Sequence, residues 1–161
     1  MAREIVVVGV DQSPQSNAAL LWAADYARRV GASLHVVSVH PHWHPGLPYA
    51  AGVAGIPLVD QRGWDEQAHA AMGQLFESVN PEPHWTLTEI DGTPGPELVE
   101  AAANASLLVV GTREHVGADR FVEGSVSHYC LRHSLVPVVT VPLSYLMTAD
   151  EAATERSATV D

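Results

Sequence analysis

Lysine is absent from this chain of 161 residues, so all eight of its basic residues are arginines. Nineteen aspartates and glutamates give it a formal net charge of −11. Because a surface that binds nucleic acid needs clustered basic side chains, we expect no nucleic-acid partner. The absence of lysine also excludes a P-loop, whose lysine contacts the terminal phosphates of a nucleotide. A phosphoacceptor domain of the response-regulator type is excluded on the same ground.

Cysteine and long apolar runs are equally scarce. The single cysteine, Cys130, excludes an internal disulfide and favours a cytoplasmic protein. No apolar run approaches the ~20 residues of a membrane span, and the first residues lack the layout of a signal peptide. We therefore expect no membrane partner. The hydrophobic content of 47% and the length of the chain are sufficient for one domain with a buried core.

Short apolar runs alternate with helical patterns along the chain. A strand is expected over Glu4–Val10, where Ile5, Val6, Val7 and Val8 form a continuous apolar run that is typical of a parallel strand covered on both faces. Ser13 and Pro14 then suit the N-cap and first position of a helix, and Gly31 suits its end. A second strand is expected over Ser33–His40. These three elements predict a right-handed βαβ unit.

The remaining sequence continues the alternation. The expected elements are a helix over Trp64–Val79, a strand over Trp85–Ile90, a helix over Glu97–Asn104, a strand over Leu107–Val110, a helix over Ser125–Ser134 and a strand over Val136–Val141. Five strands and four helices predict an α/β fold, a doubly wound, five-stranded parallel sheet with helices on both faces. Ligands of such sheets bind beyond the carboxyl ends of the strands. Asp11, Val39 and Gly111 lie at such ends, which predicts one shared crevice.

Residues 106–127 carry the strongest local signal. An apolar run ends at Gly111, and Gly124 and Ser125 open the next helix. A strand, a loop with spaced glycines and a helix place backbone N–H groups and a positive helix end where a phosphate can lie. Since the spacing is not that of a P-loop, backbone amides, hydroxyl groups and arginine would have to hold the phosphate.

The spacing Gly111-x2-Glu114-x9-Gly124-Ser125 resembles the G-x2-G-x9-G-[ST] nucleotide loop of the universal stress protein family. The resemblance extends over residues 4–142, through VGVDQSPQS after the first strand and VPVVTVP at the end. It implies a universal stress protein domain over residues 1–142, with an adenine nucleotide alpha hydrolase-like fold and a regulatory role in stress response. Residues 143–161 would form an acidic C-terminal tail, either disordered or with a short helix over Thr148–Arg156.

The resemblance also implies a ligand and the residues that hold it. The ligand would be ATP, or ADP or AMP, with or without magnesium. Asp11 resembles the family aspartate that contacts adenosine, although a strand-end aspartate also commonly caps the next turn. The expected nucleotide-binding residues are Gly9, Val10, Asp11 and Val39 around the adenosine, and Gly111, Thr112, Arg113, Glu114, Gly117, Gly124, Ser125, Val126 and Ser127 around the phosphates.

Glu114 replaces the second glycine of the family pattern. A carboxylate ~4 Å from a phosphate opposes binding by about 4 kcal/mol at an effective dielectric constant of ~20. The acid can pair with Arg113 or Arg120, can hold a magnesium ion that bridges to the phosphates, or can indicate a different ligand such as a monophosphate. Three functions remain open: a nucleotide-binding regulator, an interaction protein that has lost ATP binding, and a slow hydrolase using Glu114 and His115. No catalytic triad is evident, and we assign no catalytic residue.

The last expected strand, Val136–Val141, is bracketed by prolines, which is typical of an edge strand. An exposed apolar edge must be covered or paired. The resembled family pairs this strand across a two-fold axis, so we expect a homodimer.

Two further groups of side chains invite chemistry. His40, His42 and His44 alternate on what could be an extended segment, and imidazole suits zinc, copper or nickel. No cysteine or carboxylate lies nearby in the sequence to complete a tetrahedral site, so we expect no metal site. Cys130 is interpreted as a small buried hydrophobic residue.

Overall fold

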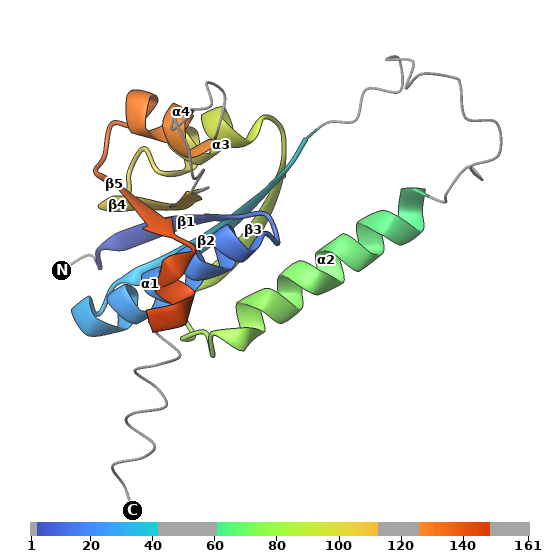
Figure 1. The fold of residues 1–161 in the computed structure, drawn as a ribbon, viewed down its shortest axis with the longest axis horizontal. Helices are drawn as coiled ribbons and strands as arrows, with labels where there is room; N and C mark the ends of the chain where they lie inside the picture. Colours follow the sequence, from blue (N-terminus) through green and yellow to red (C-terminus); the bar gives the residue numbers. More distant parts are fainter. Residues whose placement is uncertain (1–2, 42–60, 113–125, 149–161) are drawn as a thin grey trace, which may run out of the picture.

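The computed structural model of the chain describes residues 3–41, 61–112 and 126–148, with the side chains of residues 61–65 left out. Strands and helices alternate along the chain (Figure 1). They are β1 (Ile5–Val10), α1 (Pro14–Val30), β2 (Ser33–His40), α2 (Gln61–Ser78), β3 (Thr86–Asp91), α3 (Pro94–Ala101), β4 (Leu107–Thr112), α4 (Val126–His133) and β5 (Val138–Pro142).

All neighbouring strands of the sheet pair in parallel, in the order β3-β2-β1-β4-β5. The chain builds outward from β1 through β2 to β3, and then returns to the other side of β1 with β4 and β5. The strand order therefore switches between β1 and β4, where an α/β sheet forms its ligand crevice. The predicted α/β fold with a five-stranded parallel sheet is confirmed.

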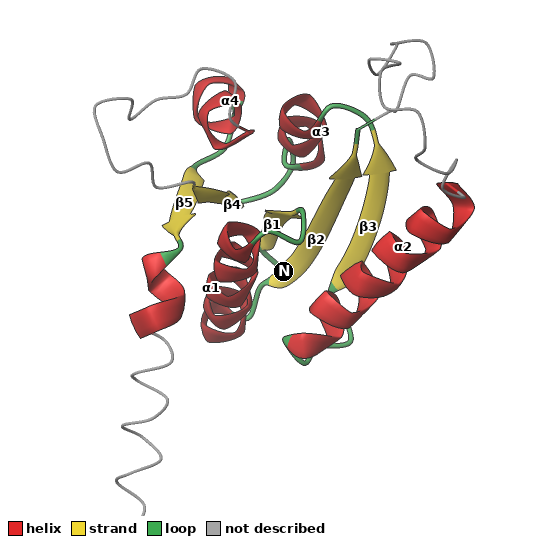
Figure 2. Ribbon diagram, turned by 45° about the vertical axis from the view of Figure 1, so that its right-hand side comes forward, coloured by secondary structure: helices red, strands yellow, loops and turns green. Residues whose placement is uncertain are grey.

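Helices cover both faces of the sheet, with α1 and α2 on one side and α3 and α4 on the other (Figure 2). Side chains alternate between the faces along each strand. Val6 and Val8 of β1 join the core under α1 and α2, whereas Val7 joins the core under α3 and α4. Burial on both faces explains why the strands are continuous apolar runs.

Both ends of α1 are closed as the sequence predicts. The Ser13 hydroxyl accepts a hydrogen bond from the backbone N–H of Ser16 at 3.2 Å, and Pro14 occupies the first turn. Gly31 ends the helix with a φ of 70°, a left-handed conformation that costs glycine little. The helix buries mainly alanines, so its backbone lies close to the sheet.

The second helix, α2, is attached mainly through its C-terminal half. Among its described side chains, residues 66–78, Met72 alone is fully buried. At its C-terminal end, the Arg28 guanidinium of α1 donates to the backbone oxygens of Val79 and Asn80 and lies 4.8 Å from the centre of the Trp85 ring. Figure 1 shows the opposite end of α2 extending away from the sheet.

Several expected boundaries are wrong, and those of α3 and β5 have an identifiable reason. Helix α3 begins at Pro94 instead of Glu97, because proline fits a first helical turn, where its missing N–H has no partner to lose. It also ends at Ala101 instead of Asn104. Strand β5 begins at Val138 instead of Val136: the Pro137 oxygen accepts from the N–H of Leu108 at 3.0 Å, and the strand is assigned only after this proline.

The last described residues continue beyond the expected end of the domain. Residues 144–148 are helical, and Tyr145 and Leu146 pack against the core under α1 and α2. The expected helix over Thr148–Arg156 lies almost wholly outside the described residues. No helix within the described ranges is long and apolar enough to cross a membrane.

Candidate functional site

A cleft of about 230 Å³ opens beyond the carboxyl ends of β1, β2 and β4. Valines and a leucine from the sheet and α3 give it an apolar floor, and polar residues from the start of α1 border it. Its lining consists of Gly9, Val10, Asp11, Ser13, Gln15, Ser16, Val37, Val39, Pro94, Leu98, Val110, Gly111, Val126 and Ser127. The cleft therefore lies where the switch in strand order predicts a ligand.

The structure brings together most of the expected nucleotide-binding residues that it describes. Those that line the cleft are Gly9, Val10, Asp11, Val39, Gly111, Val126 and Ser127. Thr112 ends β4 beside Gly111 and is partly exposed, but it is not part of the lining. Arg113, Glu114, Gly117, Gly124 and Ser125 lie outside the described residues. Three strand ends that are far apart in the sequence thus contribute to one cleft.

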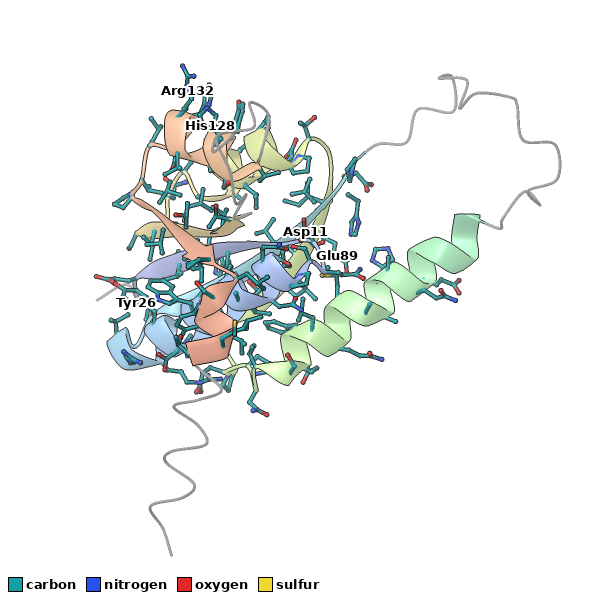
Figure 3. The ribbon with its side chains drawn as sticks, viewed as in Figure 1. Asp11, Tyr26, Glu89, His128 and Arg132 are labelled. Atoms are coloured by element: carbon teal, nitrogen blue, oxygen red, sulfur yellow. The ribbon has the colours of Figure 1, made fainter. Side chains whose placement is uncertain are left out.

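Asp11 organises the turn between β1 and α1. Its Oδ1 accepts a hydrogen bond from the backbone N–H of Ser13 at 3.0 Å, and its own N–H donates to the Ser16 hydroxyl at 3.2 Å. Asp11 is exposed at the cleft, and Figure 3 shows it where β1 meets the start of α1. The capping interpretation of Asp11 is therefore correct, and Asp11 also lines the cleft.

Close packing against α1 requires a glycine at position 111. A Cβ atom at this position would lie 2.4 Å from the backbone oxygen of Gln15. Only a glycine lets the end of β4 approach the first turn of α1 so closely. The close approach also brings Gln15 and Ser16 to the cleft, two residues that the sequence pattern does not assign to it.

Other lining residues were also missed. Ser13 and Pro94 start helices that directly follow strands, and Val37 and Leu98 complete the apolar floor. The helix starts could have been found, because a helix that follows a parallel strand begins at the carboxyl edge of the sheet. Val37 and Leu98 could not, since nothing in the sequence distinguishes a valine or leucine of the floor from one of the core.

Helix termini give the cleft its electrostatic character. Residues at the N-terminal ends of α1, α3 and α4 (Ser13, Pro94 and Val126) all border it. Each helix carries roughly half a positive charge at that end. The described residues of the lining include no arginine and no histidine, and Asp11 is their single acidic member. The backbone dipoles at these helix ends would favour an anion in the cleft, whereas the Asp11 carboxylate would oppose one placed close to it.

Cys130 is the buried residue of α4 and joins the core between this helix and the sheet. Burial raises the pKa of its thiol from 9.0 to about 11, so the thiol stays protonated at neutral pH. Since the thiolate is the reactive form, Cys130 is a small hydrophobic core residue, as expected.

The sequence matches a known protein family. A sequence model of the universal stress protein family matches residues 2–142. The chain belongs to the universal stress protein family. The universal stress protein Rv2005c of Mycobacterium tuberculosis is 31% identical over 144 residues, which cover 83% of this chain but 44% of that protein. This member of the family therefore spans less than half the length of that curated relative.

Solved structures share the fold. A universal stress protein in complex with cAMP has a TM-score of 0.64 and 23% identity, with 89% of this chain and 100% of that chain covered. The universal stress protein from Archaeoglobus fulgidus in complex with dAMP has a TM-score of 0.56 and 21% identity, with 87% and 98% covered. At these identities the likeness shows the fold alone.

Proposed function

We propose that this universal stress protein is a regulatory protein that binds an adenine nucleotide in the cleft. The observation that carries the proposal is the combination, in one cleft, of an apolar floor, a strand-end carboxylate and the N-terminal ends of three helices. Related proteins hold cAMP and dAMP. Both of these ligands join an adenine base to a single phosphate.

Each part of the cleft suits one part of such a ligand. Val37, Val39 and Val110 offer apolar contact for a base. The Asp11 carboxylate accepts hydrogen bonds from ribose hydroxyl groups. The phosphate lies toward the N-terminus of α4, where Ser127 lines the cleft and the helix dipole favours negative charge.

The number of phosphates depends on Glu114, which lies outside the described residues. We propose that it disfavours ATP relative to AMP unless magnesium accompanies the nucleotide. By the estimate of about 4 kcal/mol for a close carboxylate–phosphate pair, Glu114→Gly should strengthen ATP binding by up to roughly 1,000-fold. AMP binding should change much less. Equal affinity of both variants for ATP would show that Glu114 does not face the phosphates.

Isothermal titration with ATP, ADP and AMP, each with and without magnesium, tests the proposal. Asp11→Asn should weaken binding about tenfold, because a hydrogen bond to a charged group contributes about 1.5 kcal/mol and asparagine can still accept from Ser13. Asp91→Asn is the matched control, since Asp91 also ends a strand and is exposed but does not line the cleft. The absence of heat with every nucleotide would refute the proposal.

Glu114 favours a second candidate, in which the protein keeps the fold but has lost ATP binding and acts through protein contacts. Mass spectrometry of small molecules released from the purified protein separates the two. A nucleotide that copurifies with the natural protein excludes the second candidate. ATP affinity that appears only in Glu114→Gly supports it.

We also propose that two copies pair through β5. This strand is last in the sheet order, and no described strand lies beyond it. Because the Pro137 oxygen faces β4 and backbone groups alternate sides along a strand, Thr140 directs its N–H toward the open edge. Thr140→Pro should remove that donor and leave the pairing with β4 in place. Light scattering should show a dimer for the natural chain and a monomer for the Thr140→Pro variant. A natural chain that is itself monomeric would refute the pairing.

A further inference from the structure

Three potential metal ligands meet on the face of the sheet opposite the floor of the cleft. They are His40 at the end of β2, Glu89 on β3 and His69 on α2. The Nε2 atom of His40 lies 2.9 Å from Glu89 Oε2, and His69 Nδ1 contacts the same oxygen. All three ligand atoms lie within 4.8 Å of one another. Figure 3 shows Glu89 between the sheet and α2.

The register of the sheet brings the first two ligands together. Glu89 pairs with Ser38, two residues before His40. Since side chains of one strand alternate between faces, His40 shares its face with Val36, and Glu89 shares its face with Leu87. Val36 and Leu87 both belong to the core under α1 and α2. His40 and Glu89 therefore continue that core toward its open end.

The apolar stripe of α2 supplies the third ligand. His69 precedes Met72 by three residues and Phe76 by seven, which places all three on one side of the helix. Met72 is buried in the core and Phe76 packs against it. The stripe thus ends in a histidine at the point where α2 leaves the sheet, with a carboxylate and a second histidine opposite it.

We propose that His40, His69 and Glu89 bind a divalent transition-metal ion, with Zn²⁺ as the best match. Two imidazole nitrogens and one carboxylate oxygen suit Zn²⁺, Co²⁺, Ni²⁺ or Cu²⁺, whereas Mg²⁺ and Ca²⁺ prefer oxygen ligands alone. Three protein ligands leave at least one position for water or a further ligand. The site does not depend on nucleotide binding, because it uses none of the residues that line the cleft.

The geometry needs only a small adjustment to admit the ion. Tetrahedral zinc with ligand distances of ~2.0–2.2 Å separates its ligand atoms by about 3.3 Å. The 2.9 Å between His40 and Glu89 must therefore widen slightly, and the His69 ring must move outward from the shared oxygen. Its side chain is 58% exposed, against 32% for His40 and 20% for Glu89, so the ring has room to turn.

A bound ion would also fasten α2. The helix is held at its C-terminal end by Arg28 and in its middle by Met72. His69 lies one turn before Met72, so a metal bridge from His69 to both β2 and β3 would extend the attachment by about one turn. Binding should therefore raise the melting temperature and slow amide exchange around His69.

The experiment titrates the full chain, freed of metal with a chelator, with Zn²⁺ in competition with a chromophoric indicator. We expect binding of one equivalent by the site. His69→Gln and Glu89→Gln should each weaken it by roughly tenfold or more, since even supporting groups around a metal contribute that much. Two variants serve as matched controls. His133→Gln changes a histidine of α4, on the other face of the sheet, and Glu77→Gln changes an exposed glutamate of α2. Neither variant should change the affinity for zinc.

The double variant His42→Gln, His44→Gln distinguishes this site from the neighbouring histidines. If it retains zinc affinity while His69→Gln loses it, the proposal is supported. Zinc affinity that persists in His69→Gln, or a melting temperature that zinc does not raise in the natural chain, would overturn it. His69 is exposed on a helix, so its glutamine variant should fold, and melting without metal verifies this.

Discussion

Helices α1 and α2 cover the same face of the sheet but are attached to it in different ways. In α1 the buried residues run along most of the helix, they are mostly alanines, and both helix ends are capped. In α2 the described side chains include one fully buried residue, Met72, and a histidine that faces a carboxylate. Small side chains let α1 lie close to the strands, while α2 depends on a few large side chains and on polar contacts at its margins.

The difference in packing matches the position of each helix relative to the cleft. The first helix supplies the turn that carries Asp11 and borders the cleft, so its position must be fixed, and close packing fixes it. The second helix contributes nothing described to the cleft. It carries His69 of the side-chain cluster that we propose as a metal site.

The largest expected effect compares one buried side chain on each helix. Leu20→Ala in α1 should lower the free energy of unfolding by about 3 kcal/mol, because its surroundings cannot collapse into the cavity. Met72→Ala in α2 should cost about 2 kcal/mol, since α2 can shift toward the sheet. Urea unfolding measures both values. A larger loss for Met72→Ala would mean that α2 is as rigidly held as α1.

The next effect concerns α4, on the other face of the sheet. Burial raises the pKa of Cys130 to about 11 in the folded state, above the ordinary value of 9.0. Below pH 9 the thiol is protonated in both states and contributes nothing. As the pH rises from about 9 to about 11, the unfolded chain loses this proton and the folded chain keeps it, so stability should fall by on the order of 2 kcal/mol.

Cys130→Ala provides the control for this pH dependence. The difference in unfolding free energy between the natural chain and the variant should narrow or reverse with increasing pH in this range. A constant difference would show that the thiol ionises as easily in the folded protein as in the unfolded chain, and that α4 opens readily.

Two glycines, Gly31 and Gly73, have open space where a Cβ atom would lie, with no neighbour within 4 Å, and give smaller effects of opposite sign. Gly31→Ala should destabilise by about 1 kcal/mol, because Gly31 ends α1 with a positive φ. Gly73→Ala, inside α2, should stabilise by about 0.5–1 kcal/mol through helix propensity. Thermal melting measures both. Destabilisation by Gly73→Ala would show that α2 is not an ordinary helix at that point.

The last comparison changes no residue and measures amide hydrogen exchange in the natural chain. Backbone amides of α1 around Leu20 should exchange only through global unfolding, whereas amides around His69 should exchange through local opening of α2. Mass spectrometry of peptic fragments measures both in one experiment. Equal protection of the two helices would remove the contrast between them.

Much of the fold follows from local patterns. The run Ile5–Val8 predicts a strand that is buried on both faces, and the caps Ser13 and Gly31 predict the limits of α1, because each depends on neighbouring residues alone. The limits of α3 and β5 were wrong because prolines are compatible with both a first helical turn and the residue before a strand. Pairing with β4, which decides where β5 begins, is not written in the local sequence.

Strand-end position also predicted where the cleft opens, since topology alone brings Asp11, Val39 and Gly111 to one edge of the sheet. The structure adds a packing role for Gly111: the sequence places this glycine in the expected phosphate loop, and the folded chain brings the backbone of Gln15 against it. Local spacing cannot reveal which group approaches a glycine.

The order of residues was sufficient to predict the alternation of strands and helices, the edge of the sheet at which the cleft opens and the family to which the chain belongs. Only the tertiary structure shows that α1 packs more tightly than α2. It alone also shows which side chains lie next to His40. The sequence places His42 and His44 near His40, whereas strand register and the apolar stripe of α2 bring Glu89 and His69 to it from distant parts of the chain. The physical reason is that contacts across a sheet join residues far apart in the chain, and no local pattern records them.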